Sequence, residues 1–140
     1  MTRVSGFSDL RESQPVPEIA LVIDRLGIIK YCGAADDYAY VHWDYPRITG
    51  QGFPDLVVQG WLTFAHMCRA VTRWIPLEIA DVVAYAVRYN KPTFPGAVTV
   101  GGNVARISNE NGARQAELAL WAKDAKGQVT TSATMTLRFV

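Results

Sequence analysis

The loop from Asp36 to Asp44 carries the side chains of this chain that are best suited to proton transfer. Asp37 and His42 stand five residues apart in this loop. A carboxylate and an imidazole can act as general base and general acid near neutral pH. Asp36 is a second candidate for the carboxylate, whereas we expect Asp44 to hold the loop by local hydrogen bonds. The alternative is that Asp37 and His42 are ordinary polar residues of a solvated loop.

The composition limits what kind of protein can hold this loop. Of the 140 residues, 49% are hydrophobic, which suffices for one sizeable core but not two, so we expect a single domain over residues 1–140. The 14 basic and 13 acidic residues are scattered along the chain and give a net charge of +1. This charge offers no electrostatic footprint for nucleic acid or for an anionic membrane.

Neither a targeting segment nor a metal motif is visible. The N-terminus lacks an apolar core of signal-peptide length, and no apolar stretch approaches the ~20 residues needed to span a bilayer, so we expect a cytoplasmic protein. The two cysteines, Cys32 and Cys68, fall on separate predicted helices without metal-ligand spacing. We therefore expect two buried free thiols and no metal site.

A helix over Gly60 to Trp74 is the clearest secondary-structure signal. Apolar residues repeat there at three and four positions and cover most of the circumference. The narrow polar side consists of Thr63, His66, Arg69 and Arg73. A helix that is apolar around most of its surface must be surrounded by other elements, so we expect the C-terminal half to curve around it.

The C-terminal half has four segments with strand character, separated by turn sequences. They cover residues 79–90, 98–107, 115–123 and 129–140. Gly101-Gly102 predicts a bulge where the sheet bends, and the turns at 109–112 and 126–127 predict antiparallel hairpins.

The N-terminal part supplies one more strand and a short helix. Residues 7–17 are expected to form an extended arm, and residues 18–24 a strand. Asp24 can cap a helix that Gly33 ends, and residues 46–56 are expected to be irregular. One strand, one long helix and an antiparallel meander around that helix is the element order of an α+β hotdog fold.

The loop and the start of the long helix together resemble a known family. The signature of MaoC-like, (R)-specific enoyl hydratases and dehydratases reads Asp-x-Asn-Pro-x-His, followed some twenty residues later by x-His-Gly-x-Leu. Asp37 and His42 have the separation of its first part, and Gly60 opens the helix as in its second part. The continuation Trp43-Asp44 resembles the actinobacterial fatty-acid dehydratase branch. The likeness extends from Phe7-Ser8-Asp9 to Pro95-Gly96.

Three positions depart from the family signature. Ala39 stands in place of its Asn, Tyr40 in place of its Pro, and Gln59 in place of the His before the helix glycine. The Asn and the Pro of the signature shape the loop that holds the carboxylate, so losing both concerns the geometry of the loop. The acid–base residues themselves are retained.

The resemblance implies hydration of a trans-2-enoyl thioester, or the reverse dehydration of an (R)-3-hydroxyacyl thioester. Asp37 and His42 would hold and activate the water, and the backbone N–H of Gly60 would stabilise the enolate oxygen. Gln59 and Tyr40 are possible supporting residues. The substrate would be carried as a coenzyme A or acyl-carrier thioester, with neither a metal nor a redox cofactor. Hotdog subunits of this kind are expected to form homodimers or heterodimers.

Four further residues could take part in this chemistry. His66 is the only other histidine, and its place on the helix favours a structural role. Arg69, Arg73 and Arg88 could meet the phosphates of coenzyme A, although surface arginines are common. Acyl length, carrier and pathway stay open.

Two rival functions remain. The chain could be a non-catalytic subunit that completes the substrate tunnel of a partner, with Ala39, Tyr40 and Gln59 as signs of a decayed site. A hotdog thioesterase would place a carboxylate on the central helix, and Gly60 to Trp74 contains none. Hydrolysis is therefore the weakest of the three hypotheses.

Overall fold

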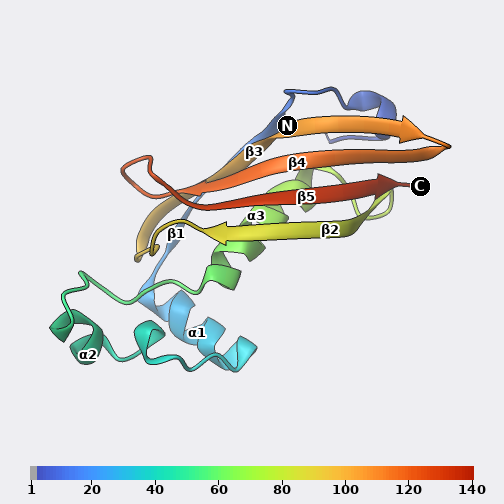
Figure 1. Ribbon diagram of the computed structural model, residues 1–140. Coiled ribbons are helices and arrows are strands. Elements are labelled where there is room, and N and C mark those ends of the chain that lie inside the picture. The colour runs from blue at the N-terminus through green and yellow to red at the C-terminus, as the bar shows by residue number, and fades with distance from the viewer. Residues whose placement is uncertain (1–2) are drawn as a thin grey trace.

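The computed structural model describes residues 3–140 and consists of one antiparallel sheet, one long helix and a small helical segment (Figure 1). The five strands are β1 (Pro15–Ile23), β2 (Ala80–Tyr89), β3 (Gly96–Glu110), β4 (Ala113–Lys123) and β5 (Val129–Phe139). Their order in the sheet is β1-β3-β4-β5-β2, so β1 and β2 are the two edges. Within residues 3–140 no helix is long and apolar enough to cross a bilayer.

The predicted hairpins between the last three strands are present. Asn111 and Gly112 have φ values of 52° and 79°, the left-handed conformation that a tight two-residue hairpin turn requires. In β5 the alternate residues Ala133, Met135 and Leu137 are buried against the core. This period of two is the one expected for a sheet with one covered face.

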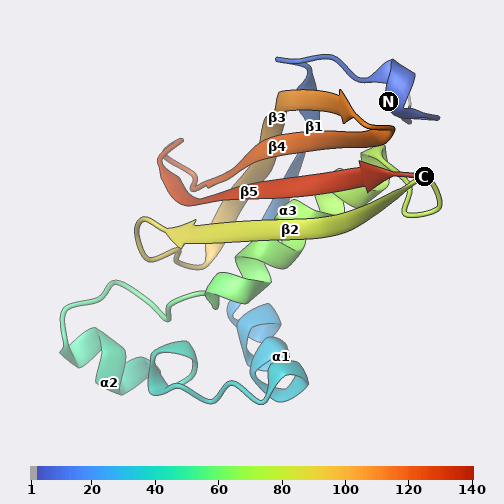
Figure 2. The ribbon, with the colours of Figure 1, turned by 45° about the vertical axis from the view of Figure 1, so that its right-hand side comes forward.

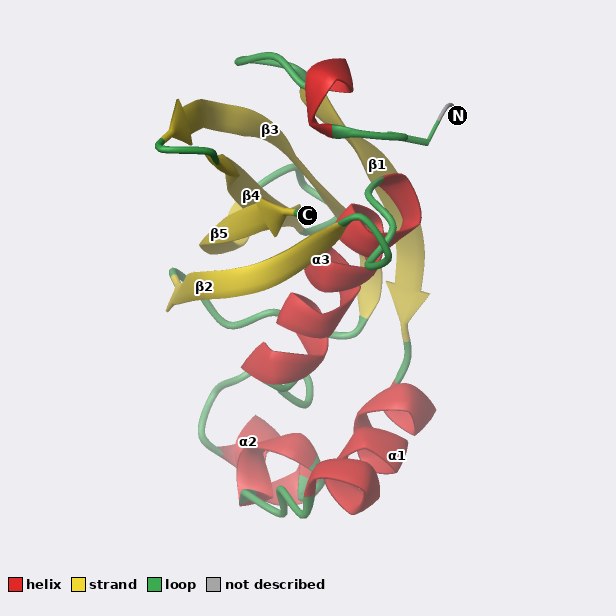
Figure 3. Cartoon of the chain, turned by 90° about the vertical axis from the view of Figure 1, so that its right-hand side faces the viewer, coloured by secondary structure: helices red, strands yellow, loops and turns green. Residues whose placement is uncertain are grey.

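Helix α3 (Gly60–Trp74) has the predicted bounds and lies in the concave side of the sheet. Figure 3 shows the sheet curling around α3, with β2 on one side and β1 on the other. Phe64, Met67 and Trp74 are buried against the strands. The α+β hotdog fold expected from the sequence is therefore confirmed.

The polar side predicted for α3 is wrong at two positions. Thr63 is 1% exposed, and its hydroxyl donates to the Gln59 carbonyl at 3.4 Å, which allows a polar residue to be buried. Trp61 belongs to the apolar repeat predicted for this helix, but its side chain is 51% exposed. Cys68 is only partly covered, so the expectation of two buried thiols holds for Cys32 alone.

Residues 24–59, which we call the connecting segment, join β1 to α3. They form α1 (Arg25–Ala35), a 3-10 turn η2 (Tyr40–His42) and α2 (Tyr45–Gly50). Figures 1 and 2 place α1 and α2 beyond one end of the sheet. A bidentate pair from Arg25 to Asp55, with both contacts at 2.9 Å, ties the two ends of the segment together and lowers the pKa of Asp55.

Several local expectations for the N-terminal half need correction. Asp24 does cap α1, accepting from the Gly27 N–H at 2.7 Å, but the helix continues past Gly33 to Ala35. The stretch 46–56, expected to be irregular, contains most of α2, because Asp44 caps that helix and Pro46 fits its first turn. The arm 7–17 contains a 3-10 turn at Phe7–Asp9 and the start of β1.

The bulge predicted at Gly101-Gly102 lies on the facing strand. Both glycines keep a regular register with β4. Opposite them the register shifts between Val16 and Ile19 of β1, and a second shift falls further along β3, between Val104 and Arg106. A Cβ on Gly102 would stand 2.3 Å from the carbonyl oxygen of Ala119. Close approach of neighbouring backbone is therefore the reason for glycine there.

Candidate active site

Asp37 and His42 come together in the connecting segment. The His42 Nε2 atom lies 3.6 Å from Asp37 Oδ2, with the imidazole almost fully buried and the carboxylate about one-third exposed. This separation is too long for a direct hydrogen bond. Both groups can instead contact one small molecule placed between them.

The other ring nitrogen of His42 determines which tautomer faces Asp37. His42 Nδ1 lies 2.6 Å from the Val57 carbonyl oxygen. A carbonyl can only accept, so Nδ1 carries a hydrogen, and whenever the ring is neutral its lone pair is at Nε2. The lone pair of Nε2 and the carboxylate of Asp37 are then both acceptors, and a water molecule between them could donate one hydrogen to each.

Backbone contacts fix the place of Asp37. Its N–H donates to the Cys32 carbonyl at 3.1 Å, and its Oδ1 accepts from the Ala39 N–H at 3.4 Å. Asp36, the rival carboxylate, ends α1 in the left-handed conformation with φ of 52° and is exposed. Asp44 accepts from the Arg47 N–H at 3.2 Å as the cap of α2, so its expected structural role is confirmed.

Gln59 joins the two helices that carry the site. It is 1% exposed, and its Nε2 donates to the Ile28 carbonyl at 3.1 Å and contacts Cys32 Sγ at 3.2 Å. Its Oε1 is buried without a hydrogen-bond partner among residues 3–140. The chain of contacts from Asp37 through Cys32 to Gln59 sets the carboxylate loop against the start of α3.

Gly60 is the first residue of α3, where the N–H groups have no partner inside the helix and the helix dipole is positive. No acceptor within residues 3–140 is hydrogen-bonded to the Gly60 N–H. The geometry is therefore compatible with donation to an oxyanion.

Tyr40 contacts other residues of the connecting segment, in and just after α2. Its hydroxyl lies 3.3 Å from Gln51 Oε1, and the Arg47 guanidinium stacks 3.8 Å above its ring. These contacts indicate that Tyr40 supports the loop. They do not bring the Tyr40 hydroxyl to the space between Asp37 and His42.

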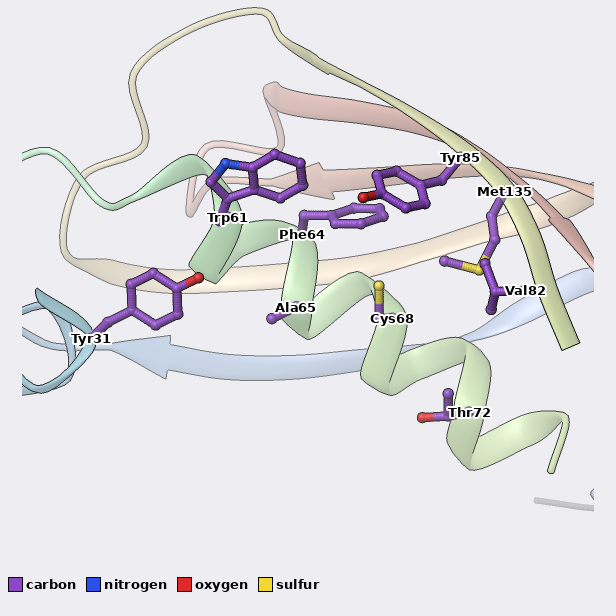
Figure 4. Close-up of a pocket in the computed structure, with 9 residues that line it drawn as sticks. All are labelled: Tyr31, Trp61, Phe64, Ala65, Cys68, Thr72, Val82, Tyr85 and Met135. Atoms are coloured by element: carbon purple, nitrogen blue, oxygen red, sulfur yellow. The ribbon is translucent and has the colours of Figure 1, made fainter. Parts of the chain in front are cut away.

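An apolar hollow of about 450 Å³ lies between α3 and β2, and its lining includes Trp61, the residue after Gly60 (Figure 4). Figure 4 shows Trp61 and Phe64 pointing toward Tyr85, while Tyr31 reaches in from α1. The hollow is lined by Tyr31, Trp61, Phe64, Ala65, Cys68, Thr72, Val82, Tyr85 and Met135. Sequence reasoning missed Tyr31 and Tyr85 as neighbours of the site, although the alternation of Tyr85 and Tyr89 in the predicted strand places both on one face.

The sequence model of the MaoC-like domain family matches residues 9–131. The chain belongs to the MaoC-like domain family. This matched range contains Asp37, His42 and Gly60, and the resemblance drawn from the loop and the helix glycine is confirmed. No curated protein sequence matches the chain.

Solved structures agree with the MaoC-like hotdog arrangement. R-hydratase PhaJ1 from Pseudomonas aeruginosa superposes with a TM-score of 0.84 at 16% identity, over 96% of this chain and 84% of that one. A chain of the ChsH1–ChsH2 complex from Mycobacterium tuberculosis superposes with a TM-score of 0.79 at 23% identity, over 93% of this chain and 98% of that one. A chain of the truncated HadBC (3R)-hydroxyacyl-ACP dehydratase complex of the same organism superposes with a TM-score of 0.73 at 12% identity, over 91% of this chain and 98% of that one. At these identities the likeness concerns the fold.

His66, in the middle of α3, does not line the apolar hollow. Its Nδ1 is buried without a partner among residues 3–140, and burial, with a smaller effect of the Arg69 charge, lowers its pKa. Within the same residues, no group of three or more His, Cys, Asp or Glu side chains is placed to hold a metal ion.

The lowered pKa of His66 predicts a pH-dependent stability. The unfolded chain binds this proton more readily than the folded chain, so stability is highest above the ordinary pKa of 6.5 and falls as the pH drops below it. Between pH values of about 7.5 and 5.5 the urea midpoint of the wild type should fall more than that of His66→Gln. His42 is common to both proteins and cancels in the comparison. Parallel pH profiles would contradict the prediction.

Proposed function

We propose that this chain hydrates a trans-2-enoyl thioester to the (R)-3-hydroxyacyl thioester, or catalyses the reverse dehydration. The observation that carries the proposal is the pair of Asp37 Oδ2 and His42 Nε2, 3.6 Å apart, with the His42 tautomer fixed by Val57. Family membership supports the reaction class, and retention of both acid–base residues supports a working site.

In the proposed reaction the water oxygen forms a bond to C3 of the enoyl group while one of its O–H bonds breaks. One member of the pair takes that proton, and a proton passes from the pair to C2, so the pair ends in the protonation state in which it began. The electrons of the double bond move onto the thioester oxygen, to which the Gly60 N–H donates. Because both groups act from one face, the addition is syn.

The substrate of the proposed reaction is a thioester of coenzyme A or of acyl carrier protein. Hydration moves protons and no electrons, so the thioester supplies its own activation and the proposal includes neither a metal nor a redox cofactor. The apolar hollow suits the acyl group, because its lining is aromatic and aliphatic.

A second candidate is a subunit that needs a partner or is itself non-catalytic. The departures at Ala39, Tyr40 and Gln59 favour it, as does the likeness to the ChsH1–ChsH2 and HadBC complexes. Hydrolysis of thioesters has less support, because α3 carries no carboxylate.

We further propose that β2 pairs with a second hotdog subunit. Every β2 residue except Ala80 and Val87 is exposed, and Val82, Val83 and Tyr85 are large apolar side chains with 40–56% exposure. An unpaired edge strand with exposed apolar residues is a template for pairing with another strand. The partner is a second copy of this chain or a different hotdog chain.

The pairing of β2 predicts that the protein is not a monomer. Sedimentation at micromolar concentration should give a dimer or larger species, alone or with its partner chain. Val83→Lys, which places a charge in the edge, should weaken the assembly, whereas the same change at Val140, an exposed C-terminal residue, should not. A monomer that hydrates enoyl thioesters would rule the idea out.

The acid–base roles predict the effects of three substitutions. Asp37→Asn and His42→Ala should each lower turnover by roughly two to four orders of magnitude, with little change in melting temperature. Asp36→Asn is the matched control, and its effect should be mild because its side chain points away to solvent. Turnover is measured as the loss of enoyl absorbance over a panel of short, long and cyclic enoyl-CoA esters. No loss with any ester would favour the partner-subunit alternative.

The role of the Gly60 amide predicts a difference between two variants. Proline removes the N–H and is tolerated in the first helical turn, and Gln59 already has the φ of −58° and ψ of 133° that suit the residue before proline. Gly60→Pro should have about two to three orders of magnitude less turnover than Gly60→Ala.

Gly60→Ala is the necessary control, because any Cβ at this position meets the Tyr89 ring at 2.5 Å. Both variants displace that ring, and only the proline variant loses the donor. Equal turnover in the two folded variants would show that the thioester oxygen is held elsewhere.

A further inference from the structure

The ring of Tyr89 covers Gly60. A Cβ built on Gly60 would stand 2.5 Å from both Cε1 and Cζ of Tyr89, so the ring occupies the space that a side chain would need. The same ring lies edge-on to Trp61, with centroids 6.5 Å apart and an interplanar angle of 79°. Tyr89 comes from the last position of β2, while Gly60 and Trp61 open α3.

Tyr89 lines one hollow and contacts a residue that lines a second one. The first, of about 300 Å³, is lined by Tyr89 and Gly60 together with Val57, Val58, Thr131 and the loop that contains Asn90 and Lys91. Trp61, which the Tyr89 ring meets edge-on, lines the apolar hollow of about 450 Å³. Gly60 lies at the border, because it lines the first hollow and is followed directly by a residue of the second.

This arrangement matches the two parts of an acyl thioester. The carrier arm of such a molecule is rich in amides, which suit the hollow with Asn90 and Lys91, and the acyl group suits the apolar hollow. With the thioester oxygen at the Gly60 N–H, an acyl group that runs from Gly60 into the apolar hollow passes Trp61 and the Tyr89 ring beside it. The position of the ring therefore limits the width of the acyl group that can lie there.

The Tyr89 side chain is exposed and is not held by a hydrogen bond of its hydroxyl. It is 48% exposed, and the hydroxyl has no hydrogen-bond partner among residues 3–140. Burial, followed by the nearby Tyr31 and Tyr85, raises the pKa of Tyr89, so the phenol stays neutral at physiological pH. A neutral ring held by edge contacts with Trp61 can rotate without breaking a hydrogen bond.

We propose that Tyr89 is a specificity-determining residue that selects acyl groups by width, admitting straight chains past Gly60 and excluding groups that branch close to the thioester. This inference rests on the proposed function, since it takes the ligand to be an acyl thioester. The property assigned to Tyr89 belongs to its ring and not to its hydroxyl.

The test measures binding separately from catalysis. Saturated thioesters cannot be hydrated, so calorimetry gives dissociation constants for butanoyl-CoA and the branched 2-methylbutanoyl-CoA with the wild type, Tyr89→Ala, Tyr89→Phe and Tyr45→Ala. Tyr45 is a tyrosine of α2 that lines neither hollow, so Tyr45→Ala is the matched control. The quantity of interest is the ratio of branched to straight dissociation constants.

Tyr89→Ala should lower this ratio by about tenfold or more, the scale of discrimination set by one methyl group in a pocket. Tyr89→Phe and Tyr45→Ala should leave it within about twofold of the wild type. An unchanged ratio in Tyr89→Ala, an equal change in Tyr89→Phe, or a wild type that binds neither thioester would each overturn the proposal.

Hydration of 2-butenoyl-CoA by the same proteins distinguishes the two proposals. Binding with the expected change of ratio but without hydration would refute the proposed function and leave the role of Tyr89 intact. Hydration with an unchanged ratio would refute the role of Tyr89 alone.

Discussion

The hydrogen bond between His42 Nδ1 and the Val57 carbonyl is the contact on which the rest of the site depends. It ties the middle of the connecting segment to the residues just before α3, and the Val57 N–H strengthens the junction by donating to the Val41 carbonyl at 2.9 Å. It also assigns the hydrogen on the imidazole, which leaves a lone pair facing Asp37. One short contact therefore sets both the position of the histidine and the tautomer of its neutral ring.

The residues that depart from the family signature make contacts that hold the same loop. Gln59 keeps a hydrogen-bond donor at the position of the family histidine and uses it to hold Ile28 and Cys32 of α1. Tyr40 replaces a residue that would restrict the backbone, and its ring is held by Arg47 instead. Where the signature has an Asn and a Pro, the loop that carries Asp37 is thus held by the backbone N–H of Ala39 and by the side chain of Tyr40.

The elements that sequence reasoning predicted well are those specified by local chemistry. The bounds of α3 follow from its apolar period, and the Asp24 cap and the hairpin turns follow from the residues at those positions. The prediction that α1 ends at Gly33 was wrong, because a glycine can continue a helix. The chain leaves the helix only at Asp36. The burial of Thr63 and the exposure of Trp61 depend on which side of α3 the strands cover. The place of Tyr89 over Gly60 likewise depends on tertiary packing, which a single sequence does not display.

The strand order carries a consequence for how the chain folds. The hairpins β3–β4 and β4–β5 join neighbouring segments, so their loops close at little entropic cost, whereas β2 reaches β5 through pairs such as Ala80 with Phe139. β1 pairs with β3 across a still longer stretch of chain, from Pro15 to Asn103, which contains α3 and the connecting segment. We expect the three-stranded meander to form early and the two edges to close late around α3. The loop with Asp37 and His42 would then reach its working geometry only after β1 and α3 have docked, which makes the site among the last parts of the molecule to become ordered.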